Sequence, residues 1–239
     1  MKYIFGPLKS RRLGNSLGIN IIPYKTCCFD CIYCQLGRTT NKTIQRKEYV
    51  DTNEVLSELK YFLQNYPAQS EKINFITFPG AGEPTLNDKI GLLIAEVKKI
   101  TPIPVAVITN GSLLSFEEVR HSLSGADVIL PTVSFYDNET FIAIHRPSQE
   151  LKAESILKGL IELRSEFKGK IWLEIMLVRG INDDPKKMKK LKETIDLIKP
   201  DKIHINTPLR LPKGVKIFTP TRKTIQKIKD LFGDKCEII

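Results

Sequence analysis

Short apolar, β-branched runs alternate with longer amphipathic stretches along this chain, and this alternation constrains its fold more than any other feature. Six of the runs are candidate buried strands, at residues 18–22, 73–78, 105–109, 128–134, 171–178 and 202–206. Helix-like stretches lie near residues 52–65, 87–100, 114–123, 150–167 and 185–198. Alternating strands and helices form parallel sheets with helices packed on them. The sequence therefore predicts an α/β fold built from six βα-type units.

The sequence contains no internal repeat, no low-complexity tract and no linker rich in Gly or Ser. After the last predicted strand, one basic helix-like run covers residues 221–232, and a short apolar segment follows it. We therefore expect one domain at residues 1–206, with a C-terminal extension at residues 207–239 packed on it. Polar side chains that precede the apolar periodic runs are candidate helix N-caps: Asp51, Asn87, Ser115, and Asp183 or Asp184.

The composition places the chain among globular proteins. With 41% hydrophobic and 27% charged residues it can bury a core, which excludes a disordered or collagen-like protein. No apolar run is long enough to span a membrane, and the first residues do not have the pattern of a signal peptide. We expect a cytoplasmic protein that does not act at a membrane.

The net charge of +10 is concentrated at the two ends of the sequence. Residues 1–50 hold nine basic and two acidic side chains, and residues 201–239 hold nine and four. If these ends meet in the fold, they can attract RNA or an anionic small substrate. The alternative is a lysine-rich solvated surface, because no basic run is interleaved with aromatic residues.

Four of the five cysteines, Cys27, Cys28, Cys31 and Cys34, lie within eight residues, and Cys236 is far from them. This placement does not suit a disulfide framework and indicates a metal site in a reducing compartment. Cys27, Cys31 and Cys34 form a C-x3-C-x2-C loop directly after the first predicted strand. Three thiolates on such a loop can bind three irons of a four-iron cluster and leave the fourth iron open for chemistry.

A structural zinc site is the competing interpretation of the cysteine loop, with Cys28 or a distant histidine as the fourth ligand. Structural zinc loops usually come as paired C-x2-4-C hooks, and the sequence contains no second hook. The three histidines, His121, His145 and His204, are isolated in the sequence. We therefore favour the cluster and expect Cys28 and Cys236 to be small buried apolar residues.

The C-x3-C-x2-C loop, with Tyr33 just before its last cysteine, resembles the signature of the radical S-adenosylmethionine (radical SAM) enzymes. The resemblance implies that Cys27, Cys31 and Cys34 hold a 4Fe–4S cluster. It also implies that the remaining iron chelates the amino and carboxylate groups of S-adenosylmethionine, with Tyr33 packed near the adenine. The implied fold is a partial (β/α)6 TIM-like barrel, which agrees with the βα-type units counted above.

The stretch Phe78–Thr85 follows the second predicted strand and contains two glycines and Glu83. Glycine lets a backbone approach a ligand closely, and a carboxylate accepts hydrogen bonds from an ammonium group, although such a stretch can also be a plain turn. Beside the cysteine loop it resembles the Gly-Gly-Glu-type motif of the superfamily, with Ala81 as a departure. The resemblance implies that Gly82 and Glu83 contact the methionine part of S-adenosylmethionine.

Asn110 and Ser134 lie at the ends of the next two predicted strands. The resemblance implies that Asn110 lies near the methionine or ribose part of the cofactor and that Ser134 contacts the ribose, whereas a turn asparagine and a strand-end serine are the plain alternatives. Arg146 and Arg179 lie on the same predicted rim, where each could hold a carboxylate or phosphate or could simply be solvated. We expect His145 to be a structural polar residue.

Further short motifs, spread over nearly the whole chain, resemble a subgroup of archaeal and bacterial radical SAM proteins often grouped with the enzymes that make the wyosine ring in tRNA. These motifs are Gly6-Pro7, Ser10–Gly14, Tyr33–Gly37, Gly82–Leu86, Arg146-Pro147 and Asn206–Arg210. Two cysteines remain outside the C-x3-C-x2-C loop, too few to hold a second 4Fe–4S cluster through thiolates alone. This count disfavours the wyosine-type form, which has additional cluster cysteines.

We therefore predict an enzyme that reductively cleaves S-adenosylmethionine to a 5′-deoxyadenosyl radical, which takes hydrogen from a substrate that the sequence does not identify. The expected partner is a flavodoxin- or ferredoxin-like electron donor, and the substrate is a small molecule, an RNA or a protein. The alternatives within this chemistry are a wyosine-type tRNA-modifying enzyme and a glycyl-radical activase. A further alternative, which is not an enzyme, is an iron–sulfur or zinc protein that binds RNA through its basic ends.

Overall fold

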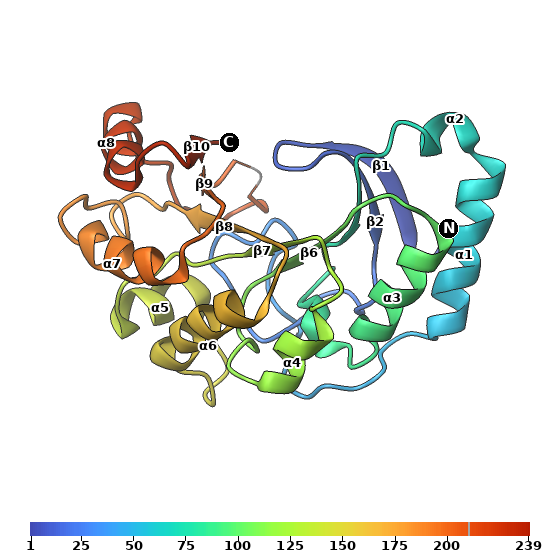
Figure 1. Ribbon diagram of the computed structural model, residues 1–239. Helices are drawn as coiled ribbons and strands as arrows, with labels where there is room; N and C mark the ends of the chain where they lie inside the picture. Colours follow the sequence, from blue (N-terminus) through green and yellow to red (C-terminus); the bar gives the residue numbers. More distant parts are fainter. Residues whose placement is uncertain (210) are drawn as a thin grey trace.

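A curved eight-stranded sheet forms the centre of the molecule, in the order β1-β2-β5-β6-β7-β8-β9-β10 (Figure 1). The computed structural model describes residues 1–209 and 211–239. The strands of this sheet are β1 (Ile4–Ser10), β2 (Gly14–Ile19), β5 (Phe75–Phe78), β6 (Val105–Thr109), β7 (Val128–Pro131), β8 (Lys170–Met176), β9 (Lys202–Asn206) and β10 (Cys236–Ile238). Neighbouring strands from β2 to β10 are parallel, and β1 pairs with β2 antiparallel. A separate two-stranded sheet joins β3 (Thr26–Cys27) to β4 (Asn41–Lys42).

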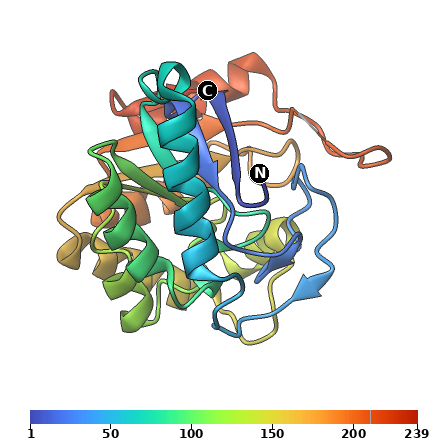
Figure 2. The ribbon, with the colours of Figure 1, turned by 90° about the vertical axis from the view of Figure 1, so that its right-hand side faces the viewer.

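Helices connect the parallel strands and cover the convex face of the sheet (Figures 1 and 2). They are α1 (Thr52–Asn65), α2 (Pro67–Ser70), α3 (Ile90–Ile100), α4 (Glu117–Ser122), α5 (Asn138–His145), α6 (Ala153–Glu166), α7 (Met188–Ile198) and α8 (Arg222–Phe232), with a short 3-10 helix, η1 (Pro84–Leu86), after β5. The predicted α/β fold with a parallel sheet is confirmed. Within the described residues, the structure contains no helix long and apolar enough to cross a membrane.

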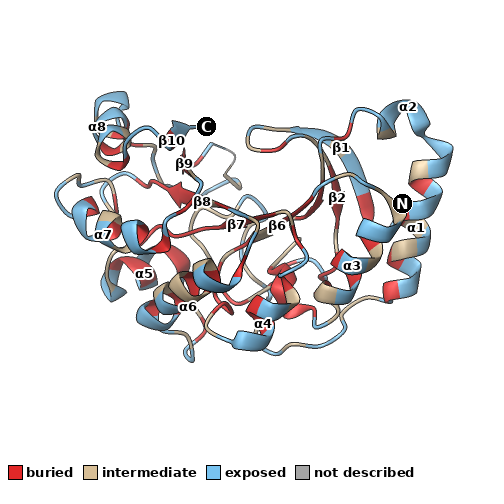
Figure 3. Cartoon of the chain, in the orientation of Figure 1, coloured by how far each residue is buried: buried red, intermediate tan, exposed pale blue. Residues whose placement is uncertain are grey.

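The two faces of the sheet bury different side chains. The strands of the sheet and the sides of the helices turned toward them carry most of the buried residues (Figure 3). On the face that meets the helices, Leu173 and Ile205 are fully buried in the main hydrophobic core. The concave face carries a smaller apolar cluster that includes Leu130 and Trp172. Leu13, from the turn between β1 and β2, packs into this second cluster. The tip of the first hairpin therefore occupies part of the interior that the curved sheet encloses.

The N-terminal edge of the sheet differs from the prediction. The strand expected at residues 18–22 corresponds to β2, which begins four residues earlier and ends at Ile19. The preceding β1 was not predicted, because Gly6 and Pro7 interrupt its apolar pattern. The strands expected at 128–134 and 171–178 are shorter and end at Pro131 and Met176. The apolar residues beyond these two ends are buried in loops. The predicted strands are too long because an apolar sequence does not distinguish a buried loop from a strand.

One of the predicted helix caps is confirmed, and the others are wrong. Asp51 accepts hydrogen bonds from the backbone N–H groups of Asn53 and Glu54 at the start of α1. The N-cap positions of α3, α4 and α7 are Lys89, Phe116 and Lys187, not Asn87, Ser115 and Asp183 or Asp184. The side chain of Asn87 instead donates a hydrogen bond to the carbonyl oxygen of Ile21 and accepts the backbone N–H of Lys89, so it joins the segment before α3 to the loop after β2.

Two elements near the sequence motifs were not predicted as such. The short helix α5 begins with a capping box between Asp137 and Thr140. It was not predicted because it is too short to show a clear helical period of apolar residues. At the C-terminus, β10 adds to the sheet beside β9, with α8 packed near it. Residue 210, in the Asn206–Arg210 motif, lies outside the described residues. The domain division at residue 206 stays a prediction.

Candidate functional site

The cysteine loop is fixed by backbone hydrogen bonds to the C-terminal end of α5. The backbone N–H of Asp30 donates to the carbonyl oxygen of His145 at 3.0 Å, and that of Ile32 donates to Ile144 at 2.9 Å. The backbone N–H of Ser148 donates to the carbonyl oxygen of Cys28 at 2.9 Å. The loop therefore has a defined conformation set by a helix more than a hundred residues away in sequence.

Each thiol of the C-x3-C-x2-C loop lies beside a polar group from another segment. Asn110 Nδ2 donates to Cys27 Sγ at 3.4 Å, and Lys25 Nζ donates to Cys34 Sγ at 3.1 Å. Cys31 Sγ lies 3.3 Å from Nδ1 of His145. These three cysteines are free and half-buried. Cys28 and Cys236 are free and fully buried among apolar residues, as predicted.

Burial controls the protonation state of Cys27, Cys31 and His145. It raises the pKa of the Cys27 thiol to about 12, with a further contribution from the carboxylate of Glu83, and raises that of Cys31 well above its ordinary value. Burial also lowers the pKa of His145 to about 3, so its ring is neutral. The metal-free thiols of Cys27 and Cys31 are therefore protonated near neutral pH, and a metal has to displace their protons.

The Gly-x-Gly-Glu segment packs directly against the start of the cysteine loop. The backbone N–H of Lys25 donates to the carbonyl oxygen of Ala81 at 2.7 Å, and that of Glu83 donates to Thr26 at 3.1 Å. A Cβ atom on Gly82 would lie 1.7 Å from the carbonyl oxygen of Thr26, which is far inside any allowed contact. Glycine is therefore required at this position for the approach of two protein segments to each other.

Glu83 is buried and holds the loops after β5 and β6 together. Its Oε1 accepts hydrogen bonds from the hydroxyls of Thr85 and Thr109, both at 2.6 Å, and from the backbone N–H of Thr85 at 3.1 Å. Its Oε2 accepts from the backbone N–H of Asn110 at 2.7 Å. Burial nevertheless raises the pKa of this carboxyl, against the opposing effect of these hydrogen bonds. Since Oε2 accepts a single protein hydrogen bond within the described chain, it keeps capacity for another donor.

The remaining predicted residues lie in different surroundings. Tyr33 faces His145, with ring centroids 5.9 Å apart and its hydroxyl 3.5 Å from Nδ1. Burial, the Cys31 thiol and the carboxylate of Glu174 raise the pKa of Tyr33. Ser134 is fully buried, and its hydroxyl accepts the backbone N–H of Met176 at 2.9 Å. The structure thus brings Cys27, Glu83 and Asn110 together, whereas Ser134 joins the ends of β7 and β8.

The candidate rim residues also differ from each other. His145, expected to be structural, contacts both Cys31 and Tyr33, and the sequence held no signal for these contacts. Arg146 ends α5 in the left-handed conformation, with its guanidinium 4.0 Å from Asp30. Arg179 donates its backbone N–H to the carbonyl oxygen of Phe218.

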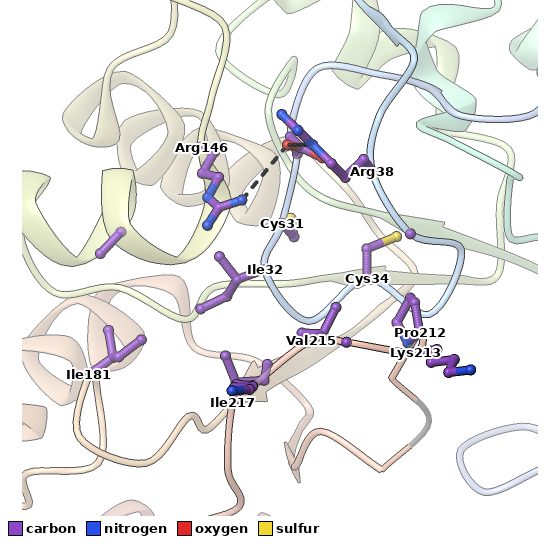
Figure 4. Close-up of a pocket in the computed structure, with 15 residues that line it drawn as sticks. Cys31, Ile32, Cys34, Arg38, Arg146, Ile181, Pro212, Lys213, Val215 and Ile217 are labelled. Atoms are coloured by element: carbon purple, nitrogen blue, oxygen red, sulfur yellow. Dashed lines mark ion pairs between the residues drawn. The ribbon is translucent and has the colours of Figure 1, made fainter.

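A cavity of about 640 Å³ opens beside the cysteine loop (Figure 4). Cys31, Ile32 and Cys34 line one side, and Arg38 and Arg146 lie at its edge. Its other walls come from Ile181, after β8, and from residues 212–217, after β9. The sequence does not predict these walls, because their apolar residues carry no motif.

Comparison with known proteins places the chain in a family. Residues 21–191 match the family model described as the radical SAM superfamily. The chain belongs to this superfamily. A UPF0026 protein of Methanocaldococcus jannaschii is 37% identical over 98% of this chain and 72% of its own length. A Brachyspira hyodysenteriae protein named GTPase Obg is 41% identical over 99% of this chain, which spans only 34% of that relative.

Solved structures of radical SAM proteins share the fold. A structure of TYW1 with a lysine-pyruvate adduct bound aligns with a TM-score of 0.64 and 18% identity, over 91% of this chain and 72% of that one. A radical SAM methyltransferase from Sphaerobacter thermophilus aligns with a TM-score of 0.71 and 12% identity, over 94% and 66%. The predicted partial barrel is therefore confirmed, and the chain is an enzyme of a superfamily that uses a 4Fe–4S cluster and S-adenosylmethionine.

The donor set fits such a cluster better than it fits a single ion. Among residues 1–209 and 211–239, no group of three or more His, Cys, Asp or Glu side chains could hold one metal ion. A zinc ion needs its ligands around a single point, whereas a 4Fe–4S cluster offers a separate iron to each thiolate. The three thiols of the loop do not surround a single point as zinc requires, but each can bind a separate iron of a 4Fe–4S cluster.

Proposed function

We propose that this radical SAM enzyme holds its 4Fe–4S cluster through Cys27, Cys31 and Cys34 and cleaves S-adenosylmethionine reductively. The observation that carries the proposal is three free thiols on one loop, each beside a polar group from another segment. When bound, the reduced cluster and S-adenosylmethionine supply a one-electron cleavage whose 5′-deoxyadenosyl radical abstracts hydrogen from a substrate.

The polar groups beside the thiols orient them and offset their negative charge once they are bound to iron. Lys25 is 3% exposed, so its ammonium acts on Cys34 with little screening by water. The side-chain amide of Asn110 donates to Cys27, and the neutral ring of His145, in the tautomer with a proton on Nδ1, would donate to an iron-bound Cys31 thiolate. Hydrogen bonds of this kind around metal-bound thiolates tune their affinity and redox potential.

The methionine end of S-adenosylmethionine is assigned to the segment that packs against Cys27. Oε2 of Glu83 has capacity to accept a hydrogen bond from the methionine ammonium. Gly82 and Asn110 flank this carboxylate and complete the segment. Ser134 as a ribose contact stays a prediction, because its buried hydroxyl already accepts a backbone N–H.

The cavity beside the cysteine loop is assigned to the nucleoside end. Ile32, Ile181 and Val215 give it apolar walls next to Cys31 and Cys34, which suits a flat heteroaromatic ring. Tyr33 belongs to the same loop and stays our candidate for packing near the adenine. Its ring meets His145 in the structure, so this role requires a contact on its other side.

Two partners complete the proposal. Radical SAM enzymes need an electron donor, and for this chain a flavodoxin- or ferredoxin-like protein stays the prediction. We propose a substrate other than the wyosine precursor, because Cys28 and Cys236 are both buried and separated, which leaves no thiolates for a second cluster. A glycyl-radical activase stays the alternative within this chemistry.

The test is metal analysis and turnover of anaerobically reconstituted protein. We expect about four irons and four sulfides per chain and formation of 5′-deoxyadenosine after reduction with dithionite. Cys31→Ala should lose the iron, while the matched controls Cys28→Ala and Cys236→Ala keep it. One zinc per chain without sulfide would contradict the proposal.

A further inference from the structure

The Ser10–Gly14 motif lies at the tip of the hairpin formed by β1 and β2, and this tip crosses the concave face of the sheet (Figure 1). Arg12 Nη1 donates to Oε2 of Glu174 on β8. Arg11 Nη2 donates to Oδ1 of Asn206, at the end of β9, at 3.0 Å. The hairpin thus connects one edge of the parallel sheet with strands near the other, through residues more than 160 positions apart.

Strand alternation places these contacts inside the barrel. Leu173 and Ile205 face the helices, so their neighbours Glu174 and Asn206 face the enclosed side. Trp172, two residues before Glu174, belongs to the apolar cluster into which Leu13 packs. A polar layer therefore lies above an apolar one, on the side where the parallel strands end and where the cysteine loop begins.

The polar layer has more positive charge and more donors than it uses. Glu174 is 6% exposed and is the one carboxylate that pairs with a guanidinium here, whereas two guanidiniums reach the layer. In the described part of the chain, Arg11 and Arg12 each make a single side-chain hydrogen bond, although a guanidinium carries five N–H donors. His204, in register with Glu174, also has a buried Nδ1 without a partner among the described residues.

We infer that Arg11 and Arg12, held by Glu174 and Asn206, form the floor of the substrate site and bind an anionic group of the substrate, a carboxylate or a phosphate. Such a group would balance the second guanidinium and take up its free N–H donors in bidentate geometry. Leu13 and Trp172 close the space below, so the rest of the substrate extends toward the cysteine loop. This inference rests on the proposed function, because it places the anion in the barrel that the cluster faces.

The experiment titrates the cluster-loaded wild-type protein with inorganic phosphate in one arm and with succinate in the other, by isothermal titration calorimetry. Trp172 is the single tryptophan of the chain, and its fluorescence reports binding at the floor. We expect saturable binding of at least one anion with a change in Trp172 emission. The anion that binds more tightly identifies the substrate group as a phosphate or a carboxylate.

Two variants test the residues. Arg11→Gln should weaken binding of the preferred anion by about 10-fold or more. Removal of Arg12 alone would leave a buried carboxylate unpaired and endanger folding, so the second variant is Arg12→Gln with Glu174→Gln, which should lose binding in the same way. The matched control, Arg222→Gln, removes an exposed arginine of α8 and should bind the anion as the wild type does.

The inference is overturned if the wild type binds neither anion, or if both variants bind as tightly as the control. Formation of 5′-deoxyadenosine by the wild type is measured on the same preparation. Cleavage without anion binding would remove the inference and leave the proposed function standing. Anion binding that depends on Arg11, in a protein without cleavage, would support the inference and count against the proposed function.

Discussion

Replacement of Glu83 separates a structural role from a cofactor role, and the structure gives the size of the first. Glu83→Ala removes the acceptor of four hydrogen bonds from a side chain that is 1% exposed. The threonine hydroxyls can rotate to other acceptors, whereas the backbone N–H groups of Thr85 and Asn110 are left without a partner. A buried unsatisfied donor costs about 1–3 kcal/mol, so two of them destabilise the protein by about 2–6 kcal/mol.

Glu83→Gln should have a smaller effect because its carbonyl oxygen can keep the contacts of Oε1. Its amide nitrogen would then face the backbone N–H of Asn110, and the loss of that one hydrogen bond costs about 1–3 kcal/mol. Both effects are large against a total stability of about 5–15 kcal/mol for a typical domain. The exposed Glu71 is the matched control, and Glu71→Ala should change stability by less than about 0.5 kcal/mol.

The assay is urea unfolding of cluster-free protein, followed by circular dichroism, so that no cofactor contributes to the result. The expected order of stability is wild type, Glu83→Gln, Glu83→Ala. Binding of S-adenosylmethionine to cluster-loaded Glu83→Gln is measured separately and should be about 10-fold or more weaker if Oε2 also accepts the methionine ammonium. Equal urea midpoints for wild type and Glu83→Ala would refute the reasoning, because the carboxylate would then support no structure.

Three further outcomes are expected. Gly82→Ala should abolish iron loading because its Cβ meets the carbonyl oxygen of Thr26. Gly180→Ala has nothing within 4 Å of the new Cβ and adds only the strain of a positive φ outside the cysteine loop, so it should load iron normally. Equal loading of the two variants would be contrary to the packing described. Partial burial would raise the pKa of Glu58, but three backbone N–H donors at residues 2–4 outweigh it and lower that pKa. The stabilising effect of Glu58 therefore exists above the ordinary value of 4.5 and is lost as the pH falls through the lowered pKa. Glu58→Gln should therefore reduce stability by about 1–2 kcal/mol at pH 7 in urea unfolding, with a gap that closes in acid; a pH-independent gap would disagree. If RNA is the substrate, the affinity for tRNA in filter binding should fall about a thousandfold between 50 and 200 mM salt. Charge reversal at three exposed basic residues of the cavity, Arg38, Lys213 and Lys216, should abolish tRNA binding. Unchanged binding by the charge-reversed protein would exclude this surface as the RNA site.

The sequence predicts those parts of the fold and site that depend on local pattern. Six of the seven parallel strands were expected from apolar runs, and each overlaps its expected range, whereas β10 was not expected. The cysteine spacing identified the superfamily, since a C-x3-C-x2-C loop carries its ligands within eight residues. Asp51 was recognisable as a cap because its hydrogen bonds reach only two and three residues along the chain.

The features that the sequence did not predict depend on contacts between distant segments. His145 lies beside Cys31 because α5 supports the cysteine loop, a contact across 114 positions. Glu83 was read as a ligand of the cofactor, and nothing local indicated that Thr85, Thr109 and Asn110 would donate to its carboxylate. The cavity walls at 212–217 have no motif, so only the fold brings them to the cysteines.

The structure also shows where the basic residues at the two ends of the sequence lie. Basic residues from both ends meet around the cavity, and one from the N-terminal part also contacts β9. Arg38 from the N-terminal part lies with Lys213 and Lys216 around the cavity, and Arg11 reaches Asn206 inside the barrel. A surface that merely keeps the protein solvated would not need to bring Arg12 across the sheet to the buried Glu174, since burial of a charge is unfavourable without a compensating partner. The position of Arg12, with Arg11 beside it, therefore favours the proposed recognition of an anion over solvation as the reason for these two basic residues.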